Sequence, residues 1–369
     1  MSKSGLLSLI LAGALVQPSV ASACTAVDVQ AKDGTVVASR TMEWFFDMQW
    51  QVVSMPQGTD YTMTAPASTG LPAVSQQTRY GIVGISTGII AGTTFLEGQN
   101  TAGLGMSANF LPGFTEYQKV TNQDKDKAYV SILDFGTWAL GSFASVAELK
   151  TGLKGLKVWY DPSLKTGPTP PTLHYVFNDR SGHGIVVEFV GGEMKIHDNK
   201  VHVLTNAPTY DWHVTNLRNY INIGTTVNAN VKINNADLTA LGSGGNTMAL
   251  RADYSPPSRF ARAAFLRAYS PQPATKEEAL QLTAHILNNV DIPKGVAGET
   301  VGKETAWDTT QWVALKDLTN NQFYIADYDH RTNFVKIDMS QLAQSTTVTK
   351  KLIGSLPYPA PADISAVMK

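Results

Sequence analysis

Cysteine is the scarcest residue of this chain, whose 369 residues include only Cys24. One thiol cannot form a disulfide within the chain, and it cannot build a thiolate-rich zinc site. The seven histidines show no H-E-x-x-H or other close ligand spacing, so the sequence predicts no metal site. A lone cysteine in an exported protein is instead a candidate reactive thiol.

The chain also lacks an excess of either charge. It has 29 Lys and Arg against 30 Asp and Glu, a formal net charge of −1, and no run of basic residues. This balance argues against nucleic acid as a partner and against a polybasic membrane anchor. Hydrophobic residues make up 43% of the sequence, enough for a sizeable core, and no linker divides it. We therefore expect a single domain over residues 24–369.

No apolar run is long enough to cross a bilayer, which takes about 20 residues. The run from Leu6 to Val16 follows the positive Lys3 and precedes Pro18 and the A-x-A sequence Ala21-Ser22-Ala23. This layout is typical of a secretory signal peptide. We expect residues 1–23 to be removed, and the mature protein to be soluble, free of the membrane, and periplasmic or secreted.

Cys24 then becomes the first residue, and three interpretations compete. It could be a small buried residue that begins a strand. It could be lipidated, although lipoprotein signals usually carry Leu or Val where this chain has Ala21, and the protein would then be a tethered, non-catalytic binding module. It could also be an N-terminal nucleophile.

Residue patterns along the chain predict strands at both ends and helices between them. A hairpin is expected from Thr25–Gln30 and Thr35–Ser39, and four short antiparallel strands are expected between residues 172 and 205. The expected helices cover Ala128–Leu140, a segment after Ser145, Asp211–Tyr220, Ser258–Tyr269 and Thr275–Val290, and two more strands cover Gln311–Leu318 and Gln322–Tyr328. The pattern indicates an α+β layered domain with a long excursion at about residues 219–253.

A serine nucleophile is disfavoured. Gly84-Ile85-Ser86-Thr87-Gly88 matches the G-x-S-x-G nucleophile elbow, which requires a helix after the serine. The residues that follow, 89–95, are β-branched and aromatic, which disfavours a helix.

An N-terminal cysteine carries a thiol and an α-amine in one residue. The amine has a pKa of about 7.7–8.0, so it can act as general base without a histidine. Such a site needs a cation near the sulfur, a carboxylate to orient the amine and donors for an oxyanion.

Several motifs in order resemble the choloylglycine hydrolase family, which includes bile salt hydrolases and penicillin V acylases. Cys24-Thr25 is followed sixteen residues later by Arg40-Thr41-Met42-Glu43-Trp44. Further matches are Glu97-Gly98-Gln99-Asn100, Asn109-Phe110, Leu204-Thr205-Asn206-Ala207-Pro208-Thr209, Asn216-Leu217-Arg218-Asn219-Tyr220 and Ser255-Pro256-Pro257-Ser258-Arg259-Phe260.

The resemblance implies a four-layer αββα sandwich of the Ntn-hydrolase type, with two antiparallel sheets between helices and no cofactor or metal. It implies that Cys24 is nucleophile and, through its amine, base, and that Arg40 lies beside the sulfur. Asn109 and Asn206 would form the oxyanion hole, and Arg259 would complete the polar network. Glu43 stands where many members carry Asp, so its carboxylate is displaced by more than about 1 Å.

The resemblance further implies hydrolysis of a linear amide with an apolar acyl group, for which Trp44, Phe45, Phe46, Trp50 and Phe110 are suited. Penicillin V, conjugated bile acids and N-acyl homoserine lactones are the candidate substrates, and export slightly favours the first. The excursion at 219–253 resembles an assembly loop and implies a homotetramer.

Overall fold

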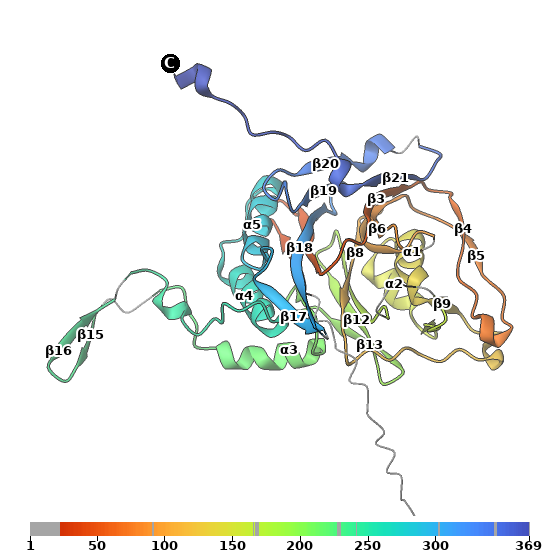
Figure 1. The fold of residues 1–369 in the computed structure, drawn as a ribbon, viewed down its shortest axis with the longest axis horizontal. Helices are drawn as coiled ribbons and strands as arrows, with labels where there is room; N and C mark the ends of the chain where they lie inside the picture. The colour runs from red at the N-terminus through yellow and green to blue at the C-terminus, as the bar shows by residue number, and fades with distance from the viewer. Residues whose placement is uncertain are drawn as a thin grey trace, which may run out of the picture.

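The computed structural model describes residues 23–90, 92–164, 166, 170–226, 230–240, 242–301, 303–342 and 345–368. The expected signal peptide therefore lies outside the described residues, apart from its last residue, Ala23. Within the described part, two large antiparallel sheets lie face to face, with helices on their outer faces (Figure 1).

The sheet that contains Cys24 has the strand order β14-β1-β2-β18-β19-β20, with β17 also paired to β18. Its strands are β1 (Cys24–Gln30), β2 (Val36–Trp44), β14 (Val203–Leu204), β17 (Ala297–Val301), β18 (Glu304–Asp317), β19 (Gln322–Asp327) and β20 (Val335–Asp338). The expected hairpin and the expected C-terminal strand pair are thus present, as β1–β2 and β18–β19.

The second sheet has the order β13-β12-β11-β8-β7-β6-β3-β21. Its strands are β3 (Trp50–Met55), β6 (Ile82–Thr87), β7 (Phe95–Asn100), β8 (Leu104–Phe110), β11 (Leu173–Asp179), β12 (Gly184–Val190), β13 (Glu193–Asp198) and β21 (Thr349–Leu352). Strands β6, β7 and β8 are buried along their whole length. They lack the alternation of polar and apolar residues that marks a half-exposed strand, and sequence reasoning therefore missed them.

Helices complete the four layers. The second sheet is covered by α1 (Ile132–Ser142) and α2 (Val146–Gly152), and the first by α4 (Pro256–Tyr269) and α5 (Lys276–Asn288); the shorter α3 (Tyr210–Asn216) runs below α4 in Figure 1. The Ser145 and Thr275 side chains accept from the N–H groups of Glu148 and Glu278, as expected of helix caps. The arrangement is the αββα sandwich that the family resemblance implied.

Helix α1 begins later than expected. Residues Tyr129–Ser131 form β9 and pair with β10 (Lys157–Trp159), and Ser131 then caps the helix by accepting from Leu133 N. Pairing with β10 replaces the first turn of the expected helix. The sequence did not indicate this pairing, because the partner strand lies nearly thirty residues away, outside any local pattern.

The segment at 219–253 leaves the body of the protein and carries a hairpin, β15 (Asn230–Ile233) and β16 (Ala236–Thr239), at its tip (Figure 1). Val231, Ile233 and Leu238 on this hairpin are exposed. The pair β4 (Asp60–Thr62) and β5 (Ser75–Gln77) forms another small hairpin at the opposite side. No helix among the described residues is long and apolar enough to cross a membrane.

Candidate active site

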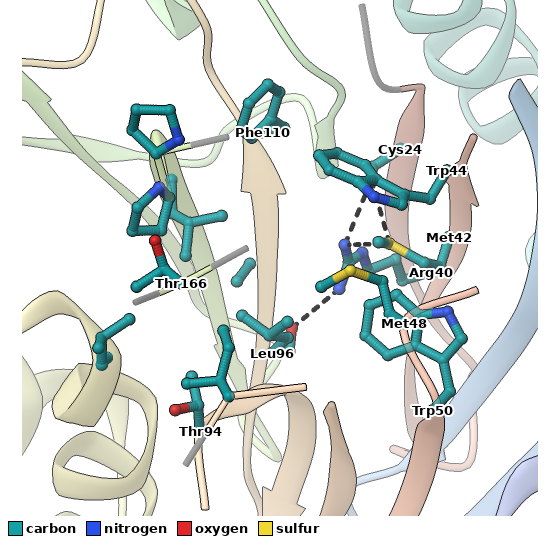
Figure 2. Close-up of a pocket in the computed structure, with 16 residues that line it drawn as sticks. Cys24, Arg40, Met42, Trp44, Met48, Trp50, Thr94, Leu96, Phe110 and Thr166 are labelled. Carbon is teal, nitrogen blue, oxygen red and sulfur yellow. Dashed lines mark hydrogen bonds between the residues drawn. The ribbon is translucent and has the colours of Figure 1, made fainter. Parts of the chain in front are cut away.

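Cys24 and Arg40 share one face of the first sheet because of the register between β1 and β2. Cys24 pairs with Met42, and Ala26 pairs with Arg40. Directly opposed residues of an antiparallel pair point to the same side, and alternate residues of one strand do likewise. Cys24, Arg40 and Met42 therefore all point between the two sheets, where they line a pocket (Figure 2).

The guanidinium of Arg40 contacts the thiol directly. Its Nη2 lies 3.2 Å from Cys24 Sγ and 3.0 Å from Met42 Sδ, and the two sulfurs are 3.6 Å apart. Cys24 and Arg40 are both buried. A cation at this distance in a site shielded from water stabilises negative charge that develops on the sulfur, so the arrangement can support a sulfur nucleophile.

A second buried charge, Glu97, compensates Arg40. Arg40 Nη1 donates to Leu96 O at 2.8 Å and lies 3.8 Å from Glu97 Oε2. Lys316 on β18 contacts the other oxygen of Glu97 and donates to Ser107 Oγ at 2.9 Å. Burial, together with the Arg40 charge, holds the pKa of Lys316 well below its ordinary value. Sequence reasoning gave Glu97 and Lys316 no role.

Arg259 and Asn206 hold the backbone of Cys24 from the other side. Cys24 N donates to Asn206 Oδ1 at 2.6 Å, and Arg259 Nη2 donates to the same oxygen at 2.8 Å. Arg259 Nη1 donates to Cys24 O and to Thr25 Oγ1, both at 2.6 Å. Because Ala23 precedes Cys24 here, the nitrogen of Cys24 is a peptide N–H, and it stands for the α-amine that processing would create. Cys24, Arg40, Asn206 and Arg259 are thus brought together.

Asn109 lies close by, but its side chain is engaged elsewhere. Its Nδ2 donates to Leu204 O at 3.2 Å and to Thr205 O at 2.9 Å, so both of its donor hydrogens go to the segment that precedes Asn206. Asn206 Nδ2 donates to Phe110 O at 2.9 Å, which uses one of its two hydrogens. Of the two expected oxyanion donors, only the Asn206 side chain retains an N–H for this purpose in this arrangement.

Glu43 lies on the opposite face of β2 from Arg40, because the two positions differ by three residues. Its Oε1 accepts from Thr310 Oγ1 at 2.7 Å, and its backbone N–H donates to Ala23 O at 3.1 Å. Burial raises the pKa of Glu43 to about 8, with the charge of Arg259 acting in the opposite direction. The Glu43 side chain therefore leaves β2 on the helix side of the sheet.

The pocket at the thiol is narrow and apolar. Its walls include Trp44, Trp50, Leu96, Phe110 and Leu173, and its volume is about 60 Å³. Trp44 meets Phe110 edge to face, with ring centroids 5.2 Å apart. Of the five expected aromatic residues, Trp44, Trp50 and Phe110 line this pocket, whereas Phe45 and Phe46 line a neighbouring hollow that Trp44 and Trp50 also border.

The G-x-S-x-G match is excluded as a nucleophile elbow. Ser86 lies within β6 and is fully buried, and the segment that follows it leads to β7 without a helix. Among the described residues, no group of three or more His, Cys, Asp or Glu could hold a metal ion.

Comparison with known proteins places this geometry in a family. The model of the linear amide C–N hydrolases of the choloylglycine hydrolase family matches residues 24–350. A bile salt hydrolase/transferase of Clostridium perfringens is 30% identical over 320 residues, 86% of this chain and 93% of the relative. A penicillin V acylase of Pectobacterium atrosepticum is 27% identical over 223 residues, 58% of this chain and 57% of the relative.

A solved structure supports the same assignment. The conjugated bile acid hydrolase of Clostridium perfringens, in a variant form, superposes with a TM-score of 0.78 at 28% identity and covers 89% of this chain and 96% of its own. The chain therefore belongs to the choloylglycine hydrolase family and is an enzyme that hydrolyses linear amide C–N bonds, of the bile salt hydrolase or penicillin V acylase type.

Proposed function

We propose that Cys24, exposed as the first residue when residues 1–23 are removed, is the nucleophile of this hydrolase. The observation that supports this is that its sulfur and its nitrogen are held separately. Arg40 Nη2 lies 3.2 Å from the sulfur, and Asn206 Oδ1 lies 2.6 Å from the nitrogen. A residue whose two functional atoms are fixed by different partners is arranged to use both.

The reaction follows from these contacts. The α-amine takes the thiol proton, and the thiolate attacks the amide carbonyl to form a tetrahedral intermediate. The oxyanion of this intermediate accepts a hydrogen bond from the remaining N–H of Asn206 Nδ2. The protonated amine then gives its proton to the leaving nitrogen, and the C–N bond breaks. Water, deprotonated by the α-amine, then attacks the thioester and releases the acid and the thiol.

Glu43 and Arg259 orient the new amine. Glu43 pairs through its backbone with Ala23, and its buried carboxyl accepts from Thr310 Oγ1 and is attracted by the charge of Arg259. Arg259 fixes the carbonyl of Cys24 and Asn206 Oδ1 together, which limits rotation of the first residue. A charged amine would also favour the ionised form of Glu43, since opposite charges stabilise each other in a buried site.

The pocket favours a compact apolar acyl group. A volume of about 60 Å³ is small for a ligand pocket, and its walls are largely aromatic and aliphatic. A flat phenoxyacetyl group would require less displacement of Trp44 and Met48 than a steroid. We therefore favour penicillin V acylase-like activity, with conjugated bile acids as the second candidate because of the overall similarity to bile salt hydrolases.

A hydrolysis panel tests this proposal. Protein beginning at Cys24 is incubated with phenoxymethylpenicillin, a glycine-conjugated bile acid and an N-acyl homoserine lactone, and the released amine is measured. We expect the highest kcat/KM with phenoxymethylpenicillin and a fall in turnover of about 10⁴-fold or more in Cys24→Ser. Preference for either other substrate would refute the substrate assignment, and a much smaller fall in Cys24→Ser would refute the nucleophile.

Processing and location need their own measurement. Intact mass of protein recovered from the periplasm or medium of an expressing two-membrane bacterium should match residues 24–369 with an unmodified N-terminus. A mass increased by acyl chains would mean that the amine is blocked, and would favour the tethered binding module. The homotetramer expected from residues 219–253 is tested by light scattering of the same sample.

A further inference from the structure

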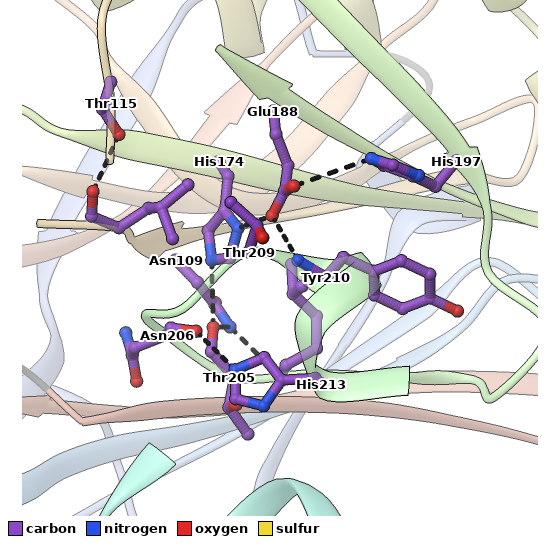
Figure 3. Close-up of polar contacts among 12 residues, drawn as sticks. Asn109, Thr115, His174, Glu188, His197, Thr205, Asn206, Thr209, Tyr210 and His213 are labelled. Atoms are coloured by element: carbon purple, nitrogen blue, oxygen red, sulfur yellow. Dashed lines mark hydrogen bonds and ion pairs between the residues drawn. The ribbon is translucent and has the colours of Figure 1, made fainter. Parts of the chain in front are cut away.

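Two successive carbonyls beside the proposed nucleophile are held by two buried histidines. His174 Nε2 lies 3.0 Å from Thr205 O, and His213 Nε2 lies 2.9 Å from Asn206 O (Figure 3). His174 comes from β11 and His213 from α3, so the segment is held from the second sheet and from a helix. The carbonyl oxygen can only accept, so in each contact the ring nitrogen carries the hydrogen.

Glu188 fixes the hydrogen-bonding state of His174. Its Oε1 lies 2.9 Å from His174 Nδ1 and accepts from Tyr210 N at 3.0 Å, and its Oε2 lies 3.7 Å from His197 Nε2. The ring of His174 therefore has an oxygen atom within hydrogen-bonding distance of each of its nitrogens. Rotation of the ring would break both contacts at once.

The same carbonyl, Thr205 O, also accepts from Asn109 Nδ2 at 2.9 Å. Asn109 and His174 are direct partners in the β8–β11 pair, so their side chains leave the sheet together. His213 is packed against Phe260 with ring centroids 4.6 Å apart, and burial lowers its pKa to about 4, so it stays a neutral donor. His174 and Asn109 thus converge on the carbonyl of Thr205, and His213 holds the next carbonyl, that of Asn206.

We propose that His174, with Glu188 behind it, is a positioning residue of this hydrolase. By clamping the Thr205 carbonyl it fixes the peptide that carries Asn206, and so aims the Asn206 amide at the Cys24 nitrogen and at the oxyanion. Asn109 contributes to the same clamp through its side chain. This inference rests on the proposed function, in which Asn206 donates to the oxyanion.

Kinetics of matched variants test the clamp. His174→Phe keeps a ring and removes both ring nitrogens, whereas His174→Gln keeps an amide N–H donor of similar reach. We expect kcat of His174→Phe to fall about 10- to 100-fold with KM within about 3-fold, since a misplaced donor costs rate more than binding. His174→Gln should recover most of kcat, and His285→Phe, at an exposed histidine of α5, should match the unmodified enzyme.

Alkylation of Cys24 by iodoacetamide separates the clamp from the nucleophile. Arg40 Nη2 lies 3.2 Å from the sulfur, whereas His174 holds the Thr205 carbonyl, so the alkylation rate of His174→Phe should stay within about 2-fold of the unmodified rate. Unchanged kcat in His174→Phe, equal impairment in His174→Gln, or alkylation that falls in parallel with kcat would each overturn the proposal.

Crystal structures of His174→Phe and His285→Phe decide the geometry without turnover. We expect the Asn206 amide to leave Cys24 N and Phe110 O only in the first variant. An Asn206 side chain in the same place in both would overturn the clamp. If the unmodified enzyme cleaves no amide, the proposed function is refuted. The comparison of the two variant crystal structures then still decides whether His174 positions the Asn206 side chain.

Discussion

Arg40 lies between a sulfur and a carboxylate: its Nη2 is 3.2 Å from Cys24 Sγ, and its Nη1 is 3.8 Å from Glu97 Oε2. The two contacts use different nitrogens of the guanidinium, whose Cζ also lies over the Trp312 ring, 5.2 Å from the ring centroid. A buried cation with a carboxylate on one side is electrically balanced before the thiol ionises. Glu97 and Lys316 therefore influence the Cys24 sulfur indirectly, through the electrostatic environment of Arg40.

The first prediction concerns the shape of this cation. Arg40→Lys keeps the charge, but a single ammonium cannot contact Cys24 Sγ and Leu96 O together as the guanidinium does. We expect kcat/KM to fall on the order of 10²-fold, and alkylation of Cys24 near neutral pH to slow. Arg79→Lys, at an exposed arginine, is the control. Equal alkylation rates in Arg40→Lys and the unmodified enzyme would contradict the role given to Arg40.

The second prediction separates the two candidate nucleophiles. Cys24→Ser should lower turnover by about 10⁴-fold or more, as loss of a nucleophile does. Ser86→Ala should leave turnover unchanged, because Ser86 is buried within β6 and is not part of the pocket wall. Released amine is measured for both, with circular dichroism to establish that each is folded. Loss of activity on replacement of Ser86 alone would reverse this assignment.

The third prediction concerns the stability of protein that retains Ala23. The pKa of Glu43 is raised by burial from 4.5 to about 8, so between these values the folded state binds a proton that the unfolded state has lost. The contribution of this group to stability is complete below about pH 4.5 and is lost as the pH rises through about 8. The free energy of unfolding should therefore decline across this window.

Glu43→Gln removes the titration and should flatten the decline, by an amount on the order of a few kcal/mol across the window. Urea unfolding at several pH values provides the measurement, and Glu193→Gln, at an exposed glutamate of β13, should leave the decline intact. An identical decline in Glu43→Gln would show that other groups cause it.

The fourth prediction uses the narrow pocket. Leu173→Trp replaces an aliphatic side chain by a larger indole ring in the wall of a cavity of about 60 Å³. We expect KM for an amide with a bulky acyl group to rise at least about 10-fold, while alkylation of Cys24 by a small reagent changes little. Val296→Trp, at an exposed position, is the control. An unchanged KM in Leu173→Trp would place the acyl group elsewhere, for example in the hollow lined by Phe45 and Phe46.

Local features of this protein could be derived from its sequence because they depend on neighbours along the chain. The β1–β2 hairpin follows from alternation around a turn, and the start of α5 follows from the cap of Thr275 on Glu278 N. That Arg40 approaches Cys24 follows from hairpin register once the turn is known. Asn109, Asn206 and Arg259 required the family resemblance, because no spacing rule joins residues so far apart.

Only the tertiary structure decided how the distant segments meet. Asn109 is 96 residues from Thr205 and Lys316 is 209 from Ser107, and neither contact leaves a pattern in the sequence. Strands β6, β7 and β8 are buried on both faces, so their residues carry no alternation to read. The sequence identified Cys24 as the candidate nucleophile through its place after the expected cleavage site and through the family resemblance, which with the expected hairpin also placed Arg40 beside it. The packing of the two sheets decided the remaining contacts of the site, because it selects among many contacts that are equally compatible with the local sequence.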